Sequence, residues 1–183
     1  MIDAELFISV DIESSGPIPG EFSLLSIGAV SVDQPQVSFY IELQPDSLKH
    51  DPESLAVTGF DIAQLARTGI EPREAMQRFS GWLSEVSALG QKPIFLGLNA
   101  PFDWSFVNYY FYKYCGSNPF GFAALDLKAY YMGVEGIRWD ETKSSRMART
   151  LGPALSATHN ALDDARYQAE LFRLMRKRRI LQG

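Results

Sequence analysis

The chain is organised around one stretch, Phe7-Ile8-Ser9-Val10-Asp11-Ile12-Glu13-Ser14-Ser15-Gly16. Side chains alternate between the two faces of a β-strand, so one face of this stretch is apolar and can pack on a core. The other face carries Asp11 and Glu13, about 6–7 Å apart along the strand. Two carboxylates this close repel each other and favour a compensating cation, and oxygen ligands suit hard ions such as Mg²⁺ or Mn²⁺. An ordinary strand that runs into a polar turn explains this stretch equally well.

Four further strands are predicted, two in the first half of the chain and two in the second. Leu24–Val32 and Val37–Leu43 are rich in β-forming residues, and Asp33–Gln36 between them indicates a hairpin loop. Three consecutive strands with short links predict an antiparallel meander. Pro93–Leu98 is a short, continuously apolar run, typical of a strand buried on both faces, and a fifth strand is expected at Phe122–Leu127.

Helical patterns fill most of the remaining chain. In Glu71–Leu89 the apolar residues recur at spacings of three and four, and Asn99 followed by Pro101 predicts a capped helix start. The expected apolar side of this second helix consists of Phe102, Phe106, Tyr109 and Tyr110. The other helices are expected at Pro52–Phe60, through Tyr130 and Tyr131, at Lys143–Leu151, and from Asn160 to about Arg179. Strands first and then strands alternating with helices predict an α/β fold, a mixed five-stranded sheet flanked by helices. No repeat or linker interrupts the chain, so a single domain over residues 1–183 is expected.

Composition narrows the class of protein. The net charge of −5 argues against a protein that coats long nucleic acids, which is normally basic. The single cysteine, Cys115, forms no internal disulfide, residues 1–5 lack the basic and apolar pattern of a signal peptide, and no apolar run is long enough to span a bilayer. These features predict a cytoplasmic protein.

Acidic side chains stand at the points where strands end or helices begin. Asp103 follows the apolar strand Pro93–Leu98, and Asp164 lies in the opening turn of the last helix, with His159 just ahead of its cap. Ligands bind at strand ends in sheets of this kind, and helix N-termini favour ionised acids. Taken singly, each acid is better explained as an ordinary first-turn carboxylate, and His159 as an ordinary loop histidine.

Taken together, these residues form an ordered pattern, Asp-x-Glu, then Asn-x-x-Phe-Asp, then His-x-x-x-x-Asp, which resembles the DEDDh group of 3′–5′ exonucleases. The motifs are Val10-Asp11-Ile12-Glu13-Ser14-Ser15-Gly16, Asn99-Ala100-Pro101-Phe102-Asp103-Trp104-Ser105-Phe106 and His159-Asn160-Ala161-Leu162-Asp163-Asp164-Ala165. The likeness runs from Leu6 to about Met175. The family commonly has threonine at one of the two serines after Glu13, and Pro101 is unusual. Within the group, Asn118-Pro119-Phe120 with Ala124-Leu125-Asp126 is similar to ribonuclease T, and Ala161-Leu162-Asp163-Asp164 to oligoribonuclease.

The resemblance implies an RNase H-like fold and a site for two divalent cations, Mg²⁺ or Mn²⁺. The ligands it implies are Asp11, Glu13, Asp103 and Asp164, all counted as catalytic, with Asp11 bridging both ions and Asp103 acting partly through water. The histidine spacing selects Asp164 over Asp163 as ligand, and the resemblance makes His159 the general base.

The resemblance also implies where the substrate binds. The resemblance predicts that Phe102 stacks on the terminal base and that Leu24 or Leu25 makes a second contact. It also predicts that backbone N–H groups near Ser15 and Gly16 hold the 3′ end. Phe102 is explained equally well as a core residue. The likeness to ribonuclease T and oligoribonuclease also favours a homodimer.

The function that follows is a metal-dependent 3′–5′ exonuclease acting on single-stranded or short nucleic acid, with RNA somewhat favoured over DNA. One alternative is a non-catalytic nucleic-acid-binding or accessory subunit of the same fold, although all five expected residues are present. Another is a metal-stabilised structural domain, which would need the acids but not His159. The motifs do not specify the choice between DNA and RNA, since it depends on local contacts at the 2′-hydroxyl.

Overall fold

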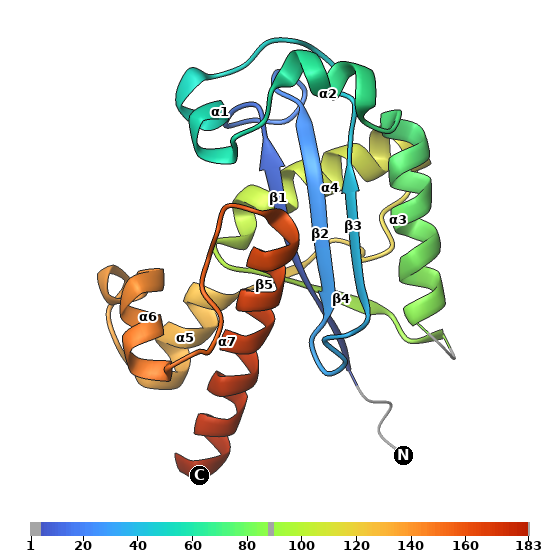
Figure 1. The fold of residues 1–183 in the computed structure, drawn as a ribbon. Coiled ribbons are helices and arrows are strands. Elements are labelled where there is room, and N and C mark those ends of the chain that lie inside the picture. The colour runs from blue at the N-terminus through green and yellow to red at the C-terminus, as the bar shows by residue number, and fades with distance from the viewer. Residues whose placement is uncertain (1–4, 88–89, 183) are drawn as a thin grey trace.

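A computed structural model describes residues 5–87 and 90–182 and shows a five-stranded sheet with helices on both faces (Figure 1). The strands are β1 (Leu6–Ser14), β2 (Leu24–Ser31), β3 (Ser38–Glu42), β4 (Pro93–Gly97) and β5 (Ala124–Asp126). Their order in the sheet is β3-β2-β1-β4-β5. β1, β2 and β3 pair antiparallel, whereas β4 and β5 join in parallel. The predicted mixed sheet, a meander followed by parallel strands, is confirmed.

The helices match the predicted segments apart from two additions, α2 and the 3₁₀ turn η2. They are α1 (Pro52–Thr58), α2 (Ile62–Thr68), α3 (Pro72–Val86), α4 (Ala100–Cys115), α5 (Leu127–Glu135), the 3₁₀ turn η2 (Trp139–Glu141), α6 (Ser144–Leu151) and α7 (Ala161–Gln182). Sequence analysis missed α2, which begins where the Asp61 carboxylate accepts the backbone N–H groups of Ala63 and Gln64. Residues 1–4, where no signal peptide was predicted, and Leu89, the predicted last apolar residue of α3, lie outside the described residues.

Two hydrophobic cores lie on opposite faces of the sheet, as the alternation along β1 predicts. Ile8, Val10 and Ile12 belong to the core shared with α3 and α4. Phe7 contributes to the other core, which α5, α6 and α7 cover. The face of β1 opposite its apolar residues is covered chiefly by α7.

Among the described helices, none has the length and apolar character needed to cross a membrane.

Two predictions about α4 are wrong in detail. Asn99 stands at the N-cap position but has φ 66° and makes no side-chain capping bond. The backbone N–H of Ala100 instead donates to Asp126 at the end of β5, 2.7 Å away, so a neighbouring strand supplies the cap. Phe102 and Tyr109, predicted on the apolar side of α4, are 37% and 38% exposed, because the buried stripe runs through Phe106 and Tyr110.

Candidate active site

The site is built where α7 crosses the carboxylate-bearing face of β1. Asp11 pairs in register with Gly28 of β2, and α7 begins directly above this glycine. A Cβ atom on Gly28 would lie 2.2 Å from the carbonyl carbon of Ala161, far inside van der Waals contact. The absence of a side chain therefore lets the first turn of α7 touch the sheet, which brings Asp164 to β1.

Three carboxylates meet at this crossing. Asp11, Glu13 and Asp164 can each present an oxygen atom so that all three atoms lie within 4.8 Å of one another. Asp11 is half-buried, and Glu13 and Asp164 are buried. A compact set of carboxylate oxygens is the chemistry that hard divalent cations prefer, so the residues present fit Mg²⁺ or Mn²⁺.

Asp103 joins this group from the other side of β1. It lies in the first turn of α4, is buried, and accepts the backbone N–H of Ile12 at 3.1 Å. Its negative charge acts on Asp11 and Glu13, whose pKa values it helps to raise. The structure thus places all four predicted acids around the last residues of β1.

His159 occupies the loop that leads into α7. The Asp164 carboxylate accepts the backbone N–H groups of Thr158 at 2.7 Å and of His159 at 3.2 Å, which fixes the loop against the helix. His159 is exposed, and its φ of 60° is a left-handed conformation that is uncommon outside glycine. It lines one hollow together with Glu13. The loop therefore places His159 at the edge of the cluster of four carboxylates.

The electrostatics of the four carboxylates favour their protonated forms. Burial, followed by the charges of Asp103, Asp164 and Glu13, raises the pKa of Asp11 well above its ordinary value. Burial and the charges of Asp164 and Asp103 raise the pKa of Glu13 to about 8. The pKa of Asp103 rises to about 7, chiefly through burial, although the hydrogen bond from Ile12 opposes the shift. A bound cation would offset the repulsion that these shifts express.

These shifts predict how stability depends on pH. A carboxyl group with a raised pKa stabilises the folded state when it is protonated, and this contribution is lost as pH rises through the folded-state pKa. The melting temperature of the protein in EDTA should therefore fall from pH 5 to about pH 8.5, across the raised pKa values of about 7 and 8. The rise in melting temperature given by Mn²⁺ should grow over the same range, because the metal displaces protons. Thermal unfolding with and without Mn²⁺ measures both, and a metal-free melting temperature that rises over this range would contradict the prediction.

Two site residues were missed by the sequence analysis. Gln168 is buried, donates from its side-chain amide to Asp11 at 2.5 Å, and accepts the backbone N–H of Leu98 at 2.9 Å. Its position one turn after Asp164 on the same helix face was the available signal. Asp126 was noted only as part of a likeness, yet it caps α4 and α5 and its charge helps to raise the pKa of Asp103. Both residues connect neighbouring elements to the carboxylates.

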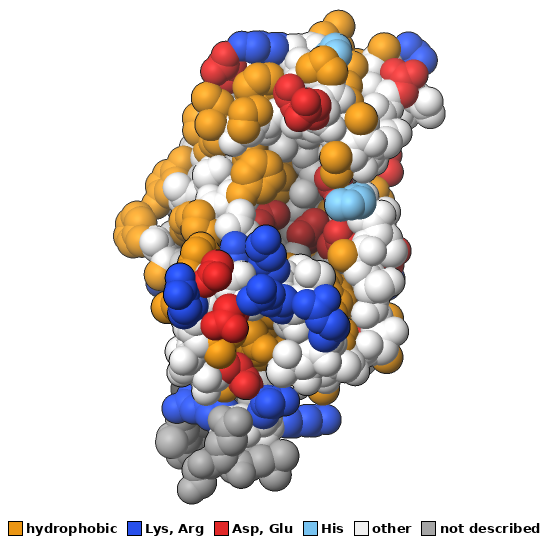
Figure 2. Space-filling model, turned by 90° about the vertical axis from the view of Figure 1, so that its left-hand side faces the viewer, with side chains coloured by type: hydrophobic (Ala, Val, Ile, Leu, Met, Phe, Trp, Pro, Cys, Tyr) orange, Lys and Arg blue, Asp and Glu red, His pale blue; other side chains and the backbone are white. Residues whose placement is uncertain are grey.

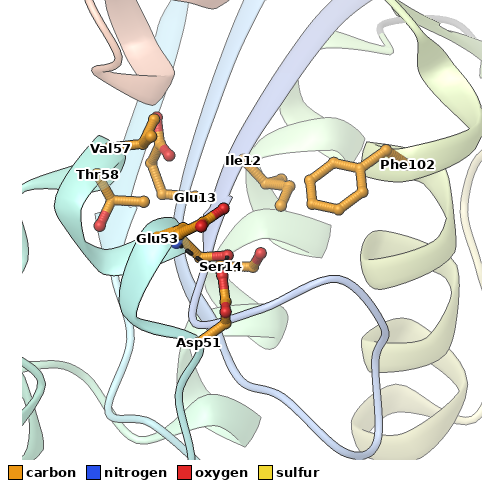
Figure 3. A pocket seen from close by; sticks show the side chains of 9 residues that line it. Ile12, Glu13, Ser14, Asp51, Glu53, Val57, Thr58 and Phe102 are labelled. Carbon is orange, nitrogen blue, oxygen red and sulfur yellow. Dashed lines mark hydrogen bonds between the residues drawn. The ribbon is translucent and has the colours of Figure 1, made fainter.

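A cavity of about 330 Å³ opens beside the carboxylates (Figure 3). Phe102 of α4 faces the end of β1 from one side, and Val57 and Thr58 of α1 lie on the other. Glu13 lines the same space, so the cavity is continuous with the acidic group. On the surface, acidic side chains lie at the base of a hollow bordered by hydrophobic ones (Figure 2). The cavity thus combines an apolar wall with carboxylates.

The other predicted substrate contacts do not open onto this cavity. Leu24 and Leu25 are completely buried, so neither offers a face on which a base could stack. The backbone N–H of Ser15 donates to the carbonyl of Ser23 at 2.8 Å, so it is already engaged. Gly16 is buried, and the Phe22 ring lies so close that a Cβ atom would be 2.2 Å from it. Complete burial contradicts the predicted stacking by Leu24 and Leu25, whereas the predicted role of the backbone near Ser15 and Gly16 stays a prediction. Phe102 is the one of these residues that faces the cavity.

Comparisons with known proteins agree with this arrangement. The model of an exonuclease family, RNase_T, matches residues 8–172. The 3′-5′ DNA exonuclease Cap18 of Escherichia coli is 48% identical over 175 residues, which cover 96% of this chain and 94% of the relative. The nuclease domain of 3′hExo, a DEDDh family member bound to rAMP, superposes with a TM-score of 0.74 at 15% identity, over 99% of this chain and 94% of that one. Escherichia coli Exonuclease I in complex with a dT13 oligonucleotide gives a TM-score of 0.76 at 16% identity, over 98% of this chain and 42% of that one.

Proposed function

Because the chain belongs to the RNase T family of exonucleases and is a 3′–5′ exonuclease, we propose that it removes nucleotides from the 3′ ends of single-stranded DNA. The observation that carries this proposal is the meeting of four carboxylates beside an aromatic-walled cavity at the end of β1. The sequence alone favoured RNA somewhat. The relative at 48% identity is named for DNA, and this supports DNA as the substrate.

The proposed cofactors are two divalent cations, Mg²⁺ or Mn²⁺, held by Asp11, Glu13, Asp103 and Asp164. When bound, a pair of such ions stabilises negative charge on the attacking and leaving oxygens of a phosphodiester. The raised pKa values of Glu13 and Asp103 support this assignment, since carboxylates held this close need positive charge to be ionised together. Gln168 holds Asp11 toward the group through its amide.

His159 is the proposed general base. A neutral imidazole accepts a proton near physiological pH, and the residue lines the same hollow as Glu13. Its loop is tied to Asp164 through two backbone hydrogen bonds, so the base and a metal ligand share one support. In this role His159 takes a proton from the water whose oxygen bonds to phosphorus. The bond from phosphorus to the 3′ oxygen of the remaining strand breaks, that oxygen takes up a proton from solvent, and the terminal nucleotide leaves as a 5′-monophosphate.

Phe102 is the proposed contact for the terminal base. More than a third of its surface is exposed, and its ring faces the cavity. Stacking on an aromatic ring contributes about 1–3 kcal/mol per base and does not depend on sequence, as a general exonuclease requires.

We also propose a cytoplasmic location from the single cysteine, Cys115, which is a free thiol. The homodimer and the single-domain assignment stay predictions.

A degradation panel tests the proposed substrate. We expect a 5′-labelled single-stranded DNA to be shortened stepwise from its 3′ end with Mg²⁺ or Mn²⁺, and to stay intact in EDTA. Single-stranded RNA of the same sequence should be degraded more slowly, and a blunt DNA duplex more slowly still. Asp11→Asn is the matched control, because it keeps the size of the side chain but removes a ligand charge. RNA degraded faster than DNA would overturn the choice of DNA, and turnover by the Asp11→Asn variant would overturn the metal site.

A further inference from the structure

We propose that the surface formed by α5, η2 and α6 binds the strand of single-stranded DNA that runs upstream of the cleaved 3′ end. This inference rests on the proposed function and extends it to a second contact region. We call it the strand surface and define it by Lys128, Trp139, Lys143, Arg146 and Arg149. The strand is a polyanion, so its path away from the site should follow positive charge and exposed aromatic rings.

The strand surface begins at the carboxylates. Asp126 ends β5, caps the first turn of α5, and also accepts the backbone N–H of Ala100 at 2.7 Å, in the helix turn that carries Asp103. Lys128 follows two residues later on α5. In the space-filling view, Lys and Arg side chains gather over these helices directly beside the acidic hollow (Figure 2). A strand leaving the site in this direction would thus meet positive charge at once.

The charge of this region differs from that of the whole chain. Residues 127–151 contain five Lys or Arg and three Asp or Glu, whereas the chain has a net charge of −5. One of the three acids, Glu135, is paired with Arg178 of α7. Arg138 and Arg146 pair with Asp140 and Glu141, but all four side chains are at least 41% exposed. Exposed pairs of this kind contribute little, so these arginines can exchange their partners for phosphate.

Other cations of the strand surface are available without any exchange. Within the part of the chain that the structure describes, Lys143 and Arg149 are exposed and have no carboxylate within ion-pair distance. The ammonium of Lys128 lies 4.5 Å from the centre of the Trp139 ring and is likewise unpaired with a described carboxylate. Three cations beside an anionic strand would release its counterions on binding.

Trp139 supplies the aromatic part of the surface. Its side chain is 52% exposed, although tryptophan is usually largely buried, and η2 holds it beside Lys128. An indole ring that stays half in solvent next to a lysine can stack on a base while the ammonium contacts the adjacent phosphate. This pairing of a ring and a cation distinguishes strand binding from a merely solvated charge.

The test compares long and short DNA. Binding is measured by fluorescence anisotropy in the Asp11→Asn background, which prevents degradation, with a single-stranded DNA of about twelve nucleotides and with a dinucleotide. We expect Trp139→Ala and Lys128→Ala each to weaken binding of the long DNA about tenfold, and to leave dinucleotide binding unchanged. Lys128→Ala should also reduce the salt dependence of long-DNA binding by about 0.7 in the slope of log K against log salt. Trp139→Tyr, which keeps an aromatic face, should restore most of the affinity.

Tyr112→Ala and Arg78→Ala are the matched controls, since they remove an exposed ring from α4 and an exposed cation from α3. Unchanged binding of the long DNA by both strand-surface variants would overturn the proposal, as would an equal loss with the dinucleotide or with the controls. A wild type that degrades RNA but not DNA would instead overturn the proposed substrate. The two failures are therefore distinguishable.

Discussion

Replacing His159 by alanine should lower turnover by about 10²–10⁴-fold, the usual contribution of a positioned general base. His159 is exposed, so the substitution leaves both cores intact, and its contact with Asp164 is made by the backbone N–H, which alanine keeps. Metal binding and single-strand binding should therefore survive.

Single-turnover rates on a labelled single-stranded DNA, measured across pH 5.5 to 9, check this result. The other histidine, His50, provides the control, because it is exposed and hydrogen-bonds the backbone of its own loop. His50→Ala should behave as the wild type. If His159→Ala retains the wild-type rate, His159 is not the base. If the wild type and the His159→Ala variant both bind DNA and neither shortens it at any pH, the proposed DNA hydrolysis is wrong.

Replacing Gly28 by alanine should impair the site although Gly28 carries no functional group. The new methyl group would overlap the backbone of Ala161 and Leu162, so the start of α7 must move away from the sheet. Overpacking of this kind costs about 1–3 kcal/mol of stability. The movement also shifts Asp164 away from Asp11, and misplacement by about 1 Å can lower a rate by about 100-fold. We expect a lower melting temperature, a loss of turnover of this order, and a smaller stabilisation by Mn²⁺.

Gly81→Ala is the matched control, because Gly81 lies in the middle of α3 and a Cβ atom there has no heavy atom within 4 Å. It should raise stability by up to about 1 kcal/mol and leave turnover and Mn²⁺ stabilisation unchanged. Thermal unfolding and initial rates separate the two variants. Full activity and full Mn²⁺ stabilisation in Gly28→Ala would show that the contact between α7 and β2 does not position Asp164.

The sequence was sufficient where local periodicity and side-chain chemistry agree. The alternation along β1 predicted both its buried residues and the shared face of Asp11 and Glu13, and all five strands lie within or close to their predicted segments. Asp103 and Asp164 were predicted to lie at helix starts, which the structure confirms. Their role as metal ligands came from the resemblance to DEDDh exonucleases. These features depend on neighbours within a few residues, so a single sequence expresses them.

The remaining features depend on contacts between distant segments. Asn99 has the right residue type for a cap, but Asp126 reaches the same helix from another strand and replaces it. Leu24 lies next to a loop in sequence, yet the sheet and α4 enclose it completely. No local pattern marks Gly28 as a contact point, since its role is defined by a helix that begins 133 residues later. Such features require the tertiary packing.

The hydrogen bond from Gln168 to Asp11 has a consequence for synthesis of the protein. It joins residues separated by 157 positions, and Asp164 reaches Asp11 from the same helix. A chain still emerging from the ribosome holds β1 long before α7 exists, so it cannot assemble the four carboxylates. Nuclease activity would therefore appear only when translation has passed α7 and the helix has docked on the sheet. A fragment ending before α7 would lack nuclease activity, however well its first strands had paired.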